Sequence, residues 1–157
     1  MQTRAERAVG RFHSEWNCAQ SVLWAFHDEL GLAPDLASRI ATGFGAGMAR
    51  RQEVCGALSG GIMVLGLRHG RGEGQGKQAT EEAYAKVEEL LLRFETLFGA
   101  CSCRELVEGC DLATAEGRQA FKDRDLKNRV CTRCVAAVVE MLERPAQRAP
   151  AAAPATA

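Results

Sequence analysis

The sequence has few histidines, few aromatic residues and no excess of charge of either sign. Among 157 residues there are three histidines, two tryptophans and one tyrosine, and 20 basic residues are balanced by 20 acidic ones. A chain without surplus positive charge is not expected to bind the phosphate backbone of nucleic acid. The histidines show no metal-ligand spacing among themselves, so a histidine-based metal site is not expected either.

Long hydrophobic runs are also missing. The most apolar stretch, residues 57–67, contains three glycines and is shorter than the roughly 20 apolar residues of a membrane span. The first residues, MQTRAER, lack the apolar run of a secretory signal. We therefore expect a cytoplasmic protein without a membrane span.

Apolar residues recur at spacings of three and four, which predicts an all-α fold. We expect one compact domain over residues 1–144, built as a bundle of about five to six helices. An Ala/Pro-rich tail over residues 145–157 is predicted to be disordered. The main expected helices cover residues 9–30, a short stretch after Pro34 with Leu36 and Ile40 facing the core, and residues 53–67, 83–98 and 126–142.

Two of these helices have features that bear on packing. The helix over residues 83–98 is expected to bury an apolar face that includes Tyr84, Leu90 and Leu97, and to end at Gly99. The helix over residues 53–67 contains four glycines, each costing up to about 1 kcal/mol against alanine. This cost is expected where another backbone or a bulky cofactor approaches the helix closely.

Cysteine is the unusual component of the sequence. The chain has seven cysteines, an odd number, so at least one thiol stays unpaired or pairs between chains. In a reducing cytosol such a set is more often metal-binding, catalytic or redox-sensing than a permanent disulfide framework.

Cys103 has the strongest individual case for reactivity. It is predicted to lie in the first turn of a short helix, where Ser102 and Glu105 would form a capping box. The unpaired amides of a helix N-terminus and the positive charge of Arg104 are expected to lower its pKa.

The positions of four other cysteines also bear on function. Cys131 and Cys134 form a C-x-x-C pair on one helix, a spacing that suits a metal, a cluster or a reversible disulfide. Cys55 is expected near a helix start with Arg50 and Arg51 a few residues before it. Cys18 is expected in the middle of the first helix, on the flank of its packed face.

These motifs together resemble the C_GCAxxG_C_C family, small bacterial and archaeal proteins described as redox-active. The likeness covers about residues 15–142 and rests on NCAQSV (17–22), GFGAGM (43–48), EVCGALSGGIM (53–63), LFG (97–99) and CREL (103–106). The resemblance implies four functional cysteines, Cys18, Cys55, Cys103 and Cys131. It assigns no role to Cys101, Cys110 or Cys134.

Three functions are compatible with the sequence. The favoured one is cysteine-based redox or electron-transfer chemistry with a redox partner protein, in which two of the four cysteines form a reversible disulfide. The second is a zinc or iron–sulfur site held by the same four thiolates, Cys18, Cys55, Cys103 and Cys131. The third is a non-enzymatic helical interaction module. The amphipathic helices are also compatible with a homodimer.

Overall fold

The computed structural model describes residues 1–144, and the tail expected over 145–157 lies outside these described residues. In the described part all regular structure is helical, without a β-strand, as the sequence predicts. There are more helices than the bundle of about five to six that periodicity suggested. They are α1 (Arg4–His13), α2 (Cys18–Ala25), α3 (Pro34–Ala41), α4 (Gly45–Met48), α5 (Gly56–His69), α6 (Lys77–Phe98), α7 (Cys103–Leu106), α8 (Ala115–Asp123) and α9 (Thr132–Glu143).

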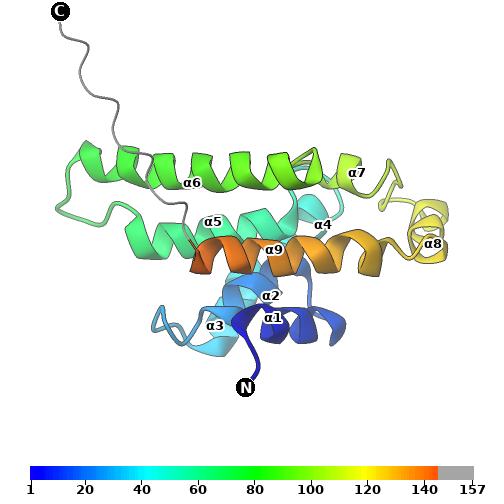
Figure 1. The fold of residues 1–157 in the computed structure, drawn as a ribbon, viewed down its shortest axis with the longest axis horizontal. Helices are drawn as coiled ribbons and strands as arrows, with labels where there is room; N and C mark the ends of the chain where they lie inside the picture. Colours follow the sequence, from blue (N-terminus) through cyan, green and yellow to red (C-terminus); the bar gives the residue numbers. More distant parts are fainter. Residues whose placement is uncertain (145–157) are drawn as a thin grey trace, which may run out of the picture.

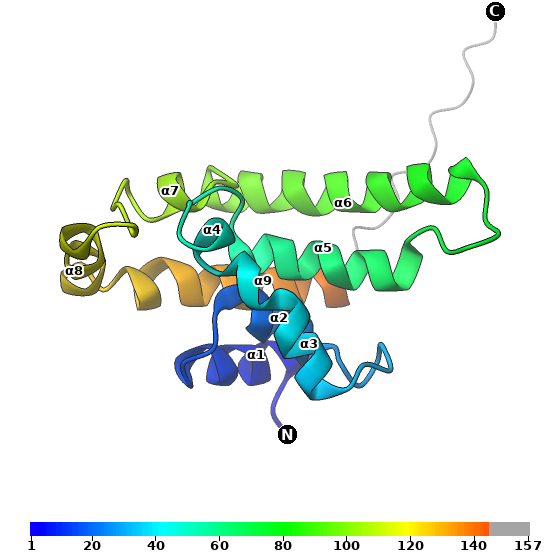
Figure 2. The same ribbon diagram turned by 180° about the vertical axis from the view of Figure 1, so that it is seen from behind.

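The longer helices are stacked in layers (Figure 1). α6 forms one outer layer, α5 and α9 lie in the middle, and α1, α2 and α3 form the other outer layer. The view from behind shows that α4, α7 and α8 gather at one end of this stack, where α5 and α9 both begin (Figure 2). The connection between α5 and α6 lies at the opposite end.

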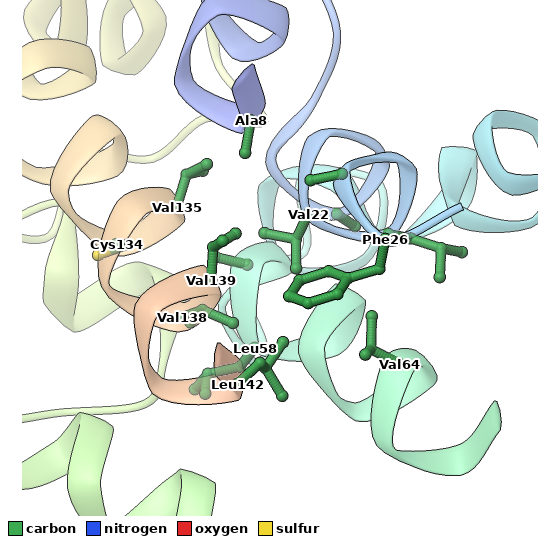
Figure 3. Packing of buried hydrophobic residues seen from close by; sticks show 14 of the residues in the cluster. Ala8, Val22, Phe26, Leu58, Val64, Cys134, Val135, Val138, Val139 and Leu142 are labelled. Carbon is green, nitrogen blue, oxygen red and sulfur yellow. The ribbon is translucent and has the colours of Figure 1, made fainter. Parts of the chain in front are cut away.

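The main hydrophobic core lies where α9 packs against α2 and α5 (Figure 3). Val138 and Val139 of α9, Val22 and Phe26 from the α2 region, and Leu58 of α5 are all fully buried there. Removing such apolar side chains from water is the main favourable contribution to folding, about 1.5–3 kcal/mol for each large one. A second, smaller cluster includes Cys103, Val107 and Leu126 at the α7 end.

The single helix expected over residues 9–30 is wrong, because the chain breaks between α1 and α2. Asn17 is the N-cap of α2: its Oδ1 accepts from the Gln20 amide at 2.9 Å, while Gln20 Oε1 accepts from the Asn17 amide at 3.1 Å. Such a reciprocal capping box satisfies amides that a helix start leaves unpaired. Glu15, at φ 71°, provides the reversal before it. The apolar periodicity continues across the break because α1 and α2 both pack into the same core.

The short helix after Pro34 forms as expected, but its buried face was predicted wrongly. Leu36 and Ile40 remain 46% and 47% exposed, whereas Ala37 and Ser38 are buried. Ser38 fixes this orientation, since its hydroxyl accepts from Arg11 Nη2 at 2.8 Å and its carbonyl from Gln20 Nε2 at 3.0 Å. These polar contacts turn the small side chains of α3 towards α2.

α6 begins earlier than expected, at Lys77, and ends as predicted at Gly99, which is left-handed at φ 83°. Of the apolar residues expected to be buried, Leu90 and Phe94 are, while Tyr84 and Leu97 are 66% and 56% exposed. α6 is an outer layer that contacts the rest of the chain along one face only (Figure 1). Its apolar stripe is therefore wider than the face that packs.

The prediction of close approach to the glycine-rich helix α5 is confirmed at its first two turns. A Cβ on Gly60 would lie 2.7 Å from the Ala19 carbonyl oxygen of α2, and one on Gly61 would lie 2.7 Å from Cγ1 of Val138. Gly66, in contrast, has no neighbour within 4 Å of such a Cβ. Glycine thus lets α2 and α9 pack directly against the α5 backbone.

The last helix, expected over residues 126–142, is helical over nearly that range, but its first turn is not α-helical. Residues Lys127–Cys131 form a π-helical turn that leads into α9. π-helical turns are frequent at functional sites. α8, which precedes this turn, was not predicted; Thr114 caps it by accepting from the Gly117 amide at 2.9 Å.

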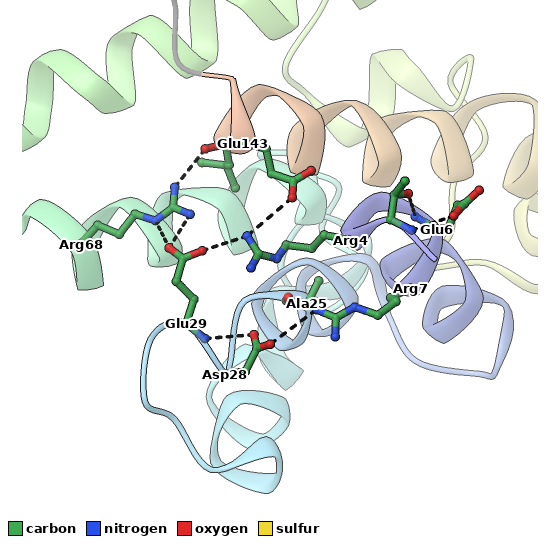
Figure 4. Close-up of polar contacts among 10 residues, drawn as sticks. Arg4, Glu6, Arg7, Ala25, Asp28, Glu29, Arg68 and Glu143 are labelled. Atoms are coloured by element: carbon green, nitrogen blue, oxygen red, sulfur yellow. Dashed lines mark hydrogen bonds and ion pairs between the residues drawn. The ribbon is translucent and has the colours of Figure 1, made fainter. Parts of the chain in front are cut away.

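Ion pairs join the other end of the bundle (Figure 4). Glu29, after α2, accepts from Arg4 of α1 at 2.8 Å and from Arg68 of α5 at 2.6 Å. The same two guanidinium groups lie over the Phe26 ring, at 4.4 and 4.9 Å from its centroid. Arg68 also donates to the Leu142 carbonyl of α9. Among the helices of residues 1–144, none is long and apolar enough to cross a membrane.

Candidate functional site

Five of the seven cysteines line one cavity at the end of the bundle where α4 and α7 meet the beginnings of α2, α5 and α9. The cavity measures about 420 Å³. Its sulfur-bearing residues are Cys18, Cys55, Cys103, Cys131 and Cys134. The four cysteines singled out from the sequence are thus brought together from four parts of the chain, and Cys134 joins them.

Cys18 is the first residue of α2, not a mid-helix residue as the sequence suggested. The break after α1 and the Asn17 cap place it at a helix start. A Cβ on Gly56 would lie 2.3 Å from the Cys18 sulfur, so only glycine at that position admits this thiol. Burial, and then the neighbouring Cys55, raise the pKa of Cys18 to about 11.

Cys55 is the N-cap residue of α5, as its expected place near a helix start implied. A short antiparallel bridge positions it: the Cys55 amide donates to the Cys101 carbonyl at 2.8 Å, and the Cys103 amide donates to the Glu53 carbonyl at 2.7 Å. This bridge fixes the two chain segments that carry Cys55 and Cys103 side by side.

Cys55 is the thiol of the cavity that is most easily ionised. A hydrogen bond with the Cys134 side chain lowers the pKa of Cys55 below its ordinary value, more than burial raises it. The backbone amides of Ala57 and Leu58, in the first turn of α5, lower the pKa further. Amides at a helix N-terminus favour negative charge, so the thiolate is stabilised at this position.

The expectation of a lowered pKa at Cys103 is wrong. Cys103 does begin the short helix α7, but it is 8% exposed, and burial raises its pKa to about 12, helped by Cys55 and Cys18 and opposed by Arg104. The amide of Cys103 already donates to Glu53, and that of Arg104 donates to the Gln52 carbonyl at 3.2 Å. The first-turn amides are therefore not free to stabilise a thiolate.

The expected capping box at this helix does not form either. Ser102 makes no side-chain cap hydrogen bond, and its hydroxyl donates to the Gln52 carbonyl at 3.4 Å. The β-bridge that pairs Val54 with Ser102 takes the place of local capping. A contact between distant segments thus decides the role of this residue.

Cys131 and Cys134 reach the cavity from the turn of helix that joins the π-helical segment to α9. Burial, and then the surrounding cysteines, raise the pKa of Cys131. The hydrogen bond with Cys55, followed by burial, raises the pKa of Cys134, which is 1% exposed. Figure 3 shows Cys134 on the same helix as the packed valines of the core.

Cys134 is the cavity residue to which the family resemblance assigned no role. Its C-x-x-C spacing from Cys131 was the signal that could have found it, since residues three apart share one helix face. The other two extra cysteines do not line the cavity. The Cys101 thiol donates to the Leu91 carbonyl at 3.7 Å, and the Cys110 sulfur accepts from Arg124 at 3.4 Å.

One wall of the cavity is a left-handed turn of backbone. Residues 46–50 all have φ between 51° and 67°, although only Gly47 among them is a glycine. Gly47 packs against Cys103, whose Cβ would lie 2.8 Å from a Cβ at position 47. Left-handed backbone costs about 1–2 kcal/mol for each non-glycine residue, and such strain concentrates at functional sites.

Gln52 anchors this wall from inside the protein. Its side chain is 2% exposed; Nε2 donates to the Cys110 carbonyl at 2.7 Å, and Oε1 accepts from the Leu112 amide at 2.9 Å. A single buried amide therefore ties the left-handed turn to the segment between α7 and α8. The sequence predicted a turn in the glycine-rich run 43–48, but nothing in it indicated the handedness or this anchor.

Comparison with known protein families identifies the family of this chain. The family described as "Putative redox-active protein (C_GCAxxG_C_C)" matches over residues 16–144. The chain belongs to this family. Neither a curated protein nor a solved structure matches it.

The C_GCAxxG_C_C cysteines can support two kinds of chemistry. In the described structure all seven cysteines are free thiols. Several thiols on one cavity can exchange electrons in pairs by forming disulfides. Within residues 1–144 no group of three or more His, Cys, Asp or Glu side chains is arranged to hold a metal ion.

Proposed function

We propose that this protein is a thiol–disulfide redox protein whose reactive centre is the cysteine-lined cavity. The observation that carries the proposal is that Cys55 and Cys134 line one cavity with three further cysteines. Within this cavity the side chain of Cys134 lowers the pKa of Cys55, which favours its thiolate. The match to a family named as redox-active supports the same chemistry.

The reaction follows from these positions. The Cys55 thiolate attacks one sulfur of an oxidised disulfide, forming a mixed disulfide and releasing the other sulfur as a thiol. Cys134 then loses its proton and attacks Cys55, which forms the Cys55–Cys134 disulfide and releases the second thiol. Two electrons leave the cysteine pair in each cycle. Cys18, Cys103 and Cys131 surround this pair, and they are the candidates for a second dithiol that restores it.

A redox titration followed by alkylation and peptide mass spectrometry tests the proposal. We expect a Cys55–Cys134 disulfide at oxidising potentials and its loss in Cys55→Ser and in Cys134→Ser. Cys110→Ser is the matched control, because Cys110 does not line the cavity and its replacement should leave the titration unchanged. If no cysteine pair changes its oxidation state near cellular potentials, the proposal is wrong.

A zinc or iron–sulfur site held by Cys18, Cys55, Cys103 and Cys131 is the second candidate. Its support is that these sulfurs share one cavity, where Gly56 leaves room for them. Anaerobic purification, metal analysis and a visible spectrum distinguish it from thiol exchange. Stoichiometric metal that is lost in Cys18→Ser would replace the redox proposal with this one.

Cellular context completes the proposal. The proposal includes a cytoplasmic location in a bacterium and a redox partner protein that acts on the partly exposed Cys18 and Cys131, which then restore the buried Cys55–Cys134 pair. A homodimer is also part of the proposal, and light scattering checks it. The alternative of a non-enzymatic helical module predicts that replacing all the cavity cysteines with serine leaves biological activity intact.

A further inference from the structure

A second pocket, about 380 Å³ in volume, adjoins the cysteine cavity. The two share Ala46, Arg50, Leu112, Phe121 and Lys127 in their walls. None of the cysteines lines the outer pocket. It therefore adjoins the cavity as a vestibule with no thiol of its own, and the combined space is in the range of small-molecule sites, roughly 300–1,000 Å³.

The vestibule is basic in a chain whose net charge is zero. Arg50, Arg118, Lys122 and Lys127 line it, against a single carboxylate, Asp125. Elsewhere in the described chain most arginines form ion pairs, for example Arg4 with Glu29 and Arg124 with Glu108. Within residues 1–144 none of the four basic vestibule residues forms an ion pair. Their charge is left for a ligand.

Two of these side chains are held in place. Arg118 donates to the carbonyls of Leu112 and Ala113 at 2.9 and 3.0 Å, and the Lys127 ammonium lies 5.0 Å from the centroid of the Phe12 ring. Arg50 and Lys122 are exposed, and their side chains form no hydrogen bond or ion pair with the described residues. The vestibule thus combines fixed and adjustable positive groups, which suits a carboxylate that enters from solvent.

Three of the cavity cysteines are almost fully buried, whereas Cys18 and Cys131 are partly exposed. Cys55, Cys103 and Cys134 are 7%, 8% and 1% exposed, too little for a disulfide on the surface of another folded protein to contact their sulfurs. A slender molecule can pass the vestibule and bring its own sulfur to the cavity. Burial of the thiols thus selects for a small substrate.

We propose that the oxidised substrate is a low-molecular-weight disulfide that carries carboxylates, with its acidic end held by the vestibule and its sulfur–sulfur bond placed in the cysteine cavity. This rests on the proposed redox function and names the substrate class for it. The Cys55 thiolate bonds to one substrate sulfur, and the substrate sulfur–sulfur bond breaks. Attack by Cys134 releases the second half, so the two protons and two electrons of the dithiol end on two molecules of substrate thiol.

Three small disulfides of different charge test this assignment on the reduced protein. Dithiodiglycolate carries two carboxylates, hydroxyethyl disulfide is neutral, and cystamine is cationic. Each rate of protein thiol loss is divided by the rate of free cysteine with the same reagent. We expect the corrected rate to be about tenfold higher for dithiodiglycolate than for the neutral reagent, lowest for cystamine, and less different at high salt.

Variants assign the effect to the vestibule. Arg50→Gln and Lys122→Gln should each remove much of the preference for the acidic disulfide, whereas Arg39→Gln, on the exposed face of α3, should keep it. Equal corrected rates for all three reagents, or a preference that survives Arg50→Gln combined with Lys122→Gln, would overturn the vestibule proposal and leave the redox function standing. If no reagent oxidises the cavity thiols, the redox function itself fails.

Discussion

The protonation of Cys55 depends on one neighbour more than on any general property of the cavity. The hydrogen bond with Cys134 is the largest influence that lowers its pKa, and it outweighs burial. We expect Cys134→Ala to raise the pKa of Cys55 and to slow its alkylation at neutral pH, about tenfold for each 1.4 kcal/mol of lost stabilisation.

A matched variant separates the hydrogen bond from packing. Cys134→Ser keeps a donor at the same position and should leave the pH profile of Cys55 alkylation near that of the unaltered chain. Peptide mass spectrometry after timed alkylation gives both profiles. Identical profiles for Cys134→Ala and Cys134→Ser would show that the hydrogen bond does not set the pKa.

Cys103 shows which part of a residue's chemistry can be read from sequence. Its place at the start of a short helix was predicted correctly, but its pKa was predicted in the wrong direction. The prediction counted the amides of α7 as free, while the structure uses two of them to bond the Gln52 and Glu53 carbonyls. Burial and the bonding of backbone groups by distant segments decide a pKa, and neither is visible in local sequence.

Glu29 permits a residue-scale prediction for stability. It accepts from both Arg4 and Arg68, which stack on Phe26, so Glu29→Gln leaves Arg68 without a carboxylate partner and Arg4 with only the more distant Glu143, at 3.6 Å. The side chains are partly exposed, so we expect the free energy of unfolding to fall by about 1 kcal/mol at low salt, and by less at high salt. Urea denaturation at two salt concentrations measures this. Asp35→Asn, at an exposed pair 3.9 Å apart, is the control and should change little.

At the scale of elements, the left-handed turn over residues 46–50 carries conformational strain that substitution can relieve. Ala49 is exposed and has φ 51° and ψ 46°, a conformation that glycine adopts without steric cost. Ala49→Gly is expected to increase the free energy of unfolding by about 0.5–1 kcal/mol. Ala85→Gly, at an exposed position inside α6, should have the opposite effect, a loss of about 1 kcal/mol. Urea denaturation of both variants checks the sign, and a loss of stability in Ala49→Gly would contradict the strain.

The elements were predicted well where one periodic pattern belongs to one helix. α5, α6 and α9 are such cases, and glycine marked the end of α6. The break between α1 and α2 was missed because both helices bury apolar residues at spacings of three and four, so the pattern runs on through the turn. Asn17, followed three residues later by Gln20, was the available signal, a capping box with amide side chains.

At the scale of the whole molecule, the sequence predicted which cysteines belong to the site better than it predicted how they are arranged. Four cysteines far apart in the chain were expected together on the strength of a family resemblance, and they line one cavity. The role of Cys134, the β-bridge between Val54 and Ser102 and the basic vestibule could not be predicted, since each depends on contacts between distant segments. The pairing of a cysteine cavity with a charged entrance exists only after α8 and α4 come together.

The clustered thiols also make the stability of the molecule depend on pH. Burial and neighbouring sulfurs raise the pKa of Cys103 to about 12 in the folded state, while an unfolded cysteine titrates near 8.5. Above that lower value the unfolded chain releases a proton that the folded chain keeps, so alkaline pH favours unfolding. The contribution of Cys103 is fully present at neutral pH and falls by about 2 kcal/mol by about pH 10.

Cys55 acts in the opposite direction, because its pKa is lowered, but Cys18, Cys131 and Cys134 act in the same direction as Cys103. We therefore expect the free energy of unfolding, measured by urea denaturation under reducing conditions, to decrease from neutral pH to about pH 10. In Cys103→Ser this decrease should be smaller by about 2 kcal/mol, whatever the variant does to stability at neutral pH. Because every other ionisable group is present in both proteins, the difference between the two curves reports the Cys103 thiol and its effect on the neighbouring Cys131. Parallel curves would mean that Cys103 ionises as readily in the folded chain as in the unfolded one, and that the cavity does not hold its proton.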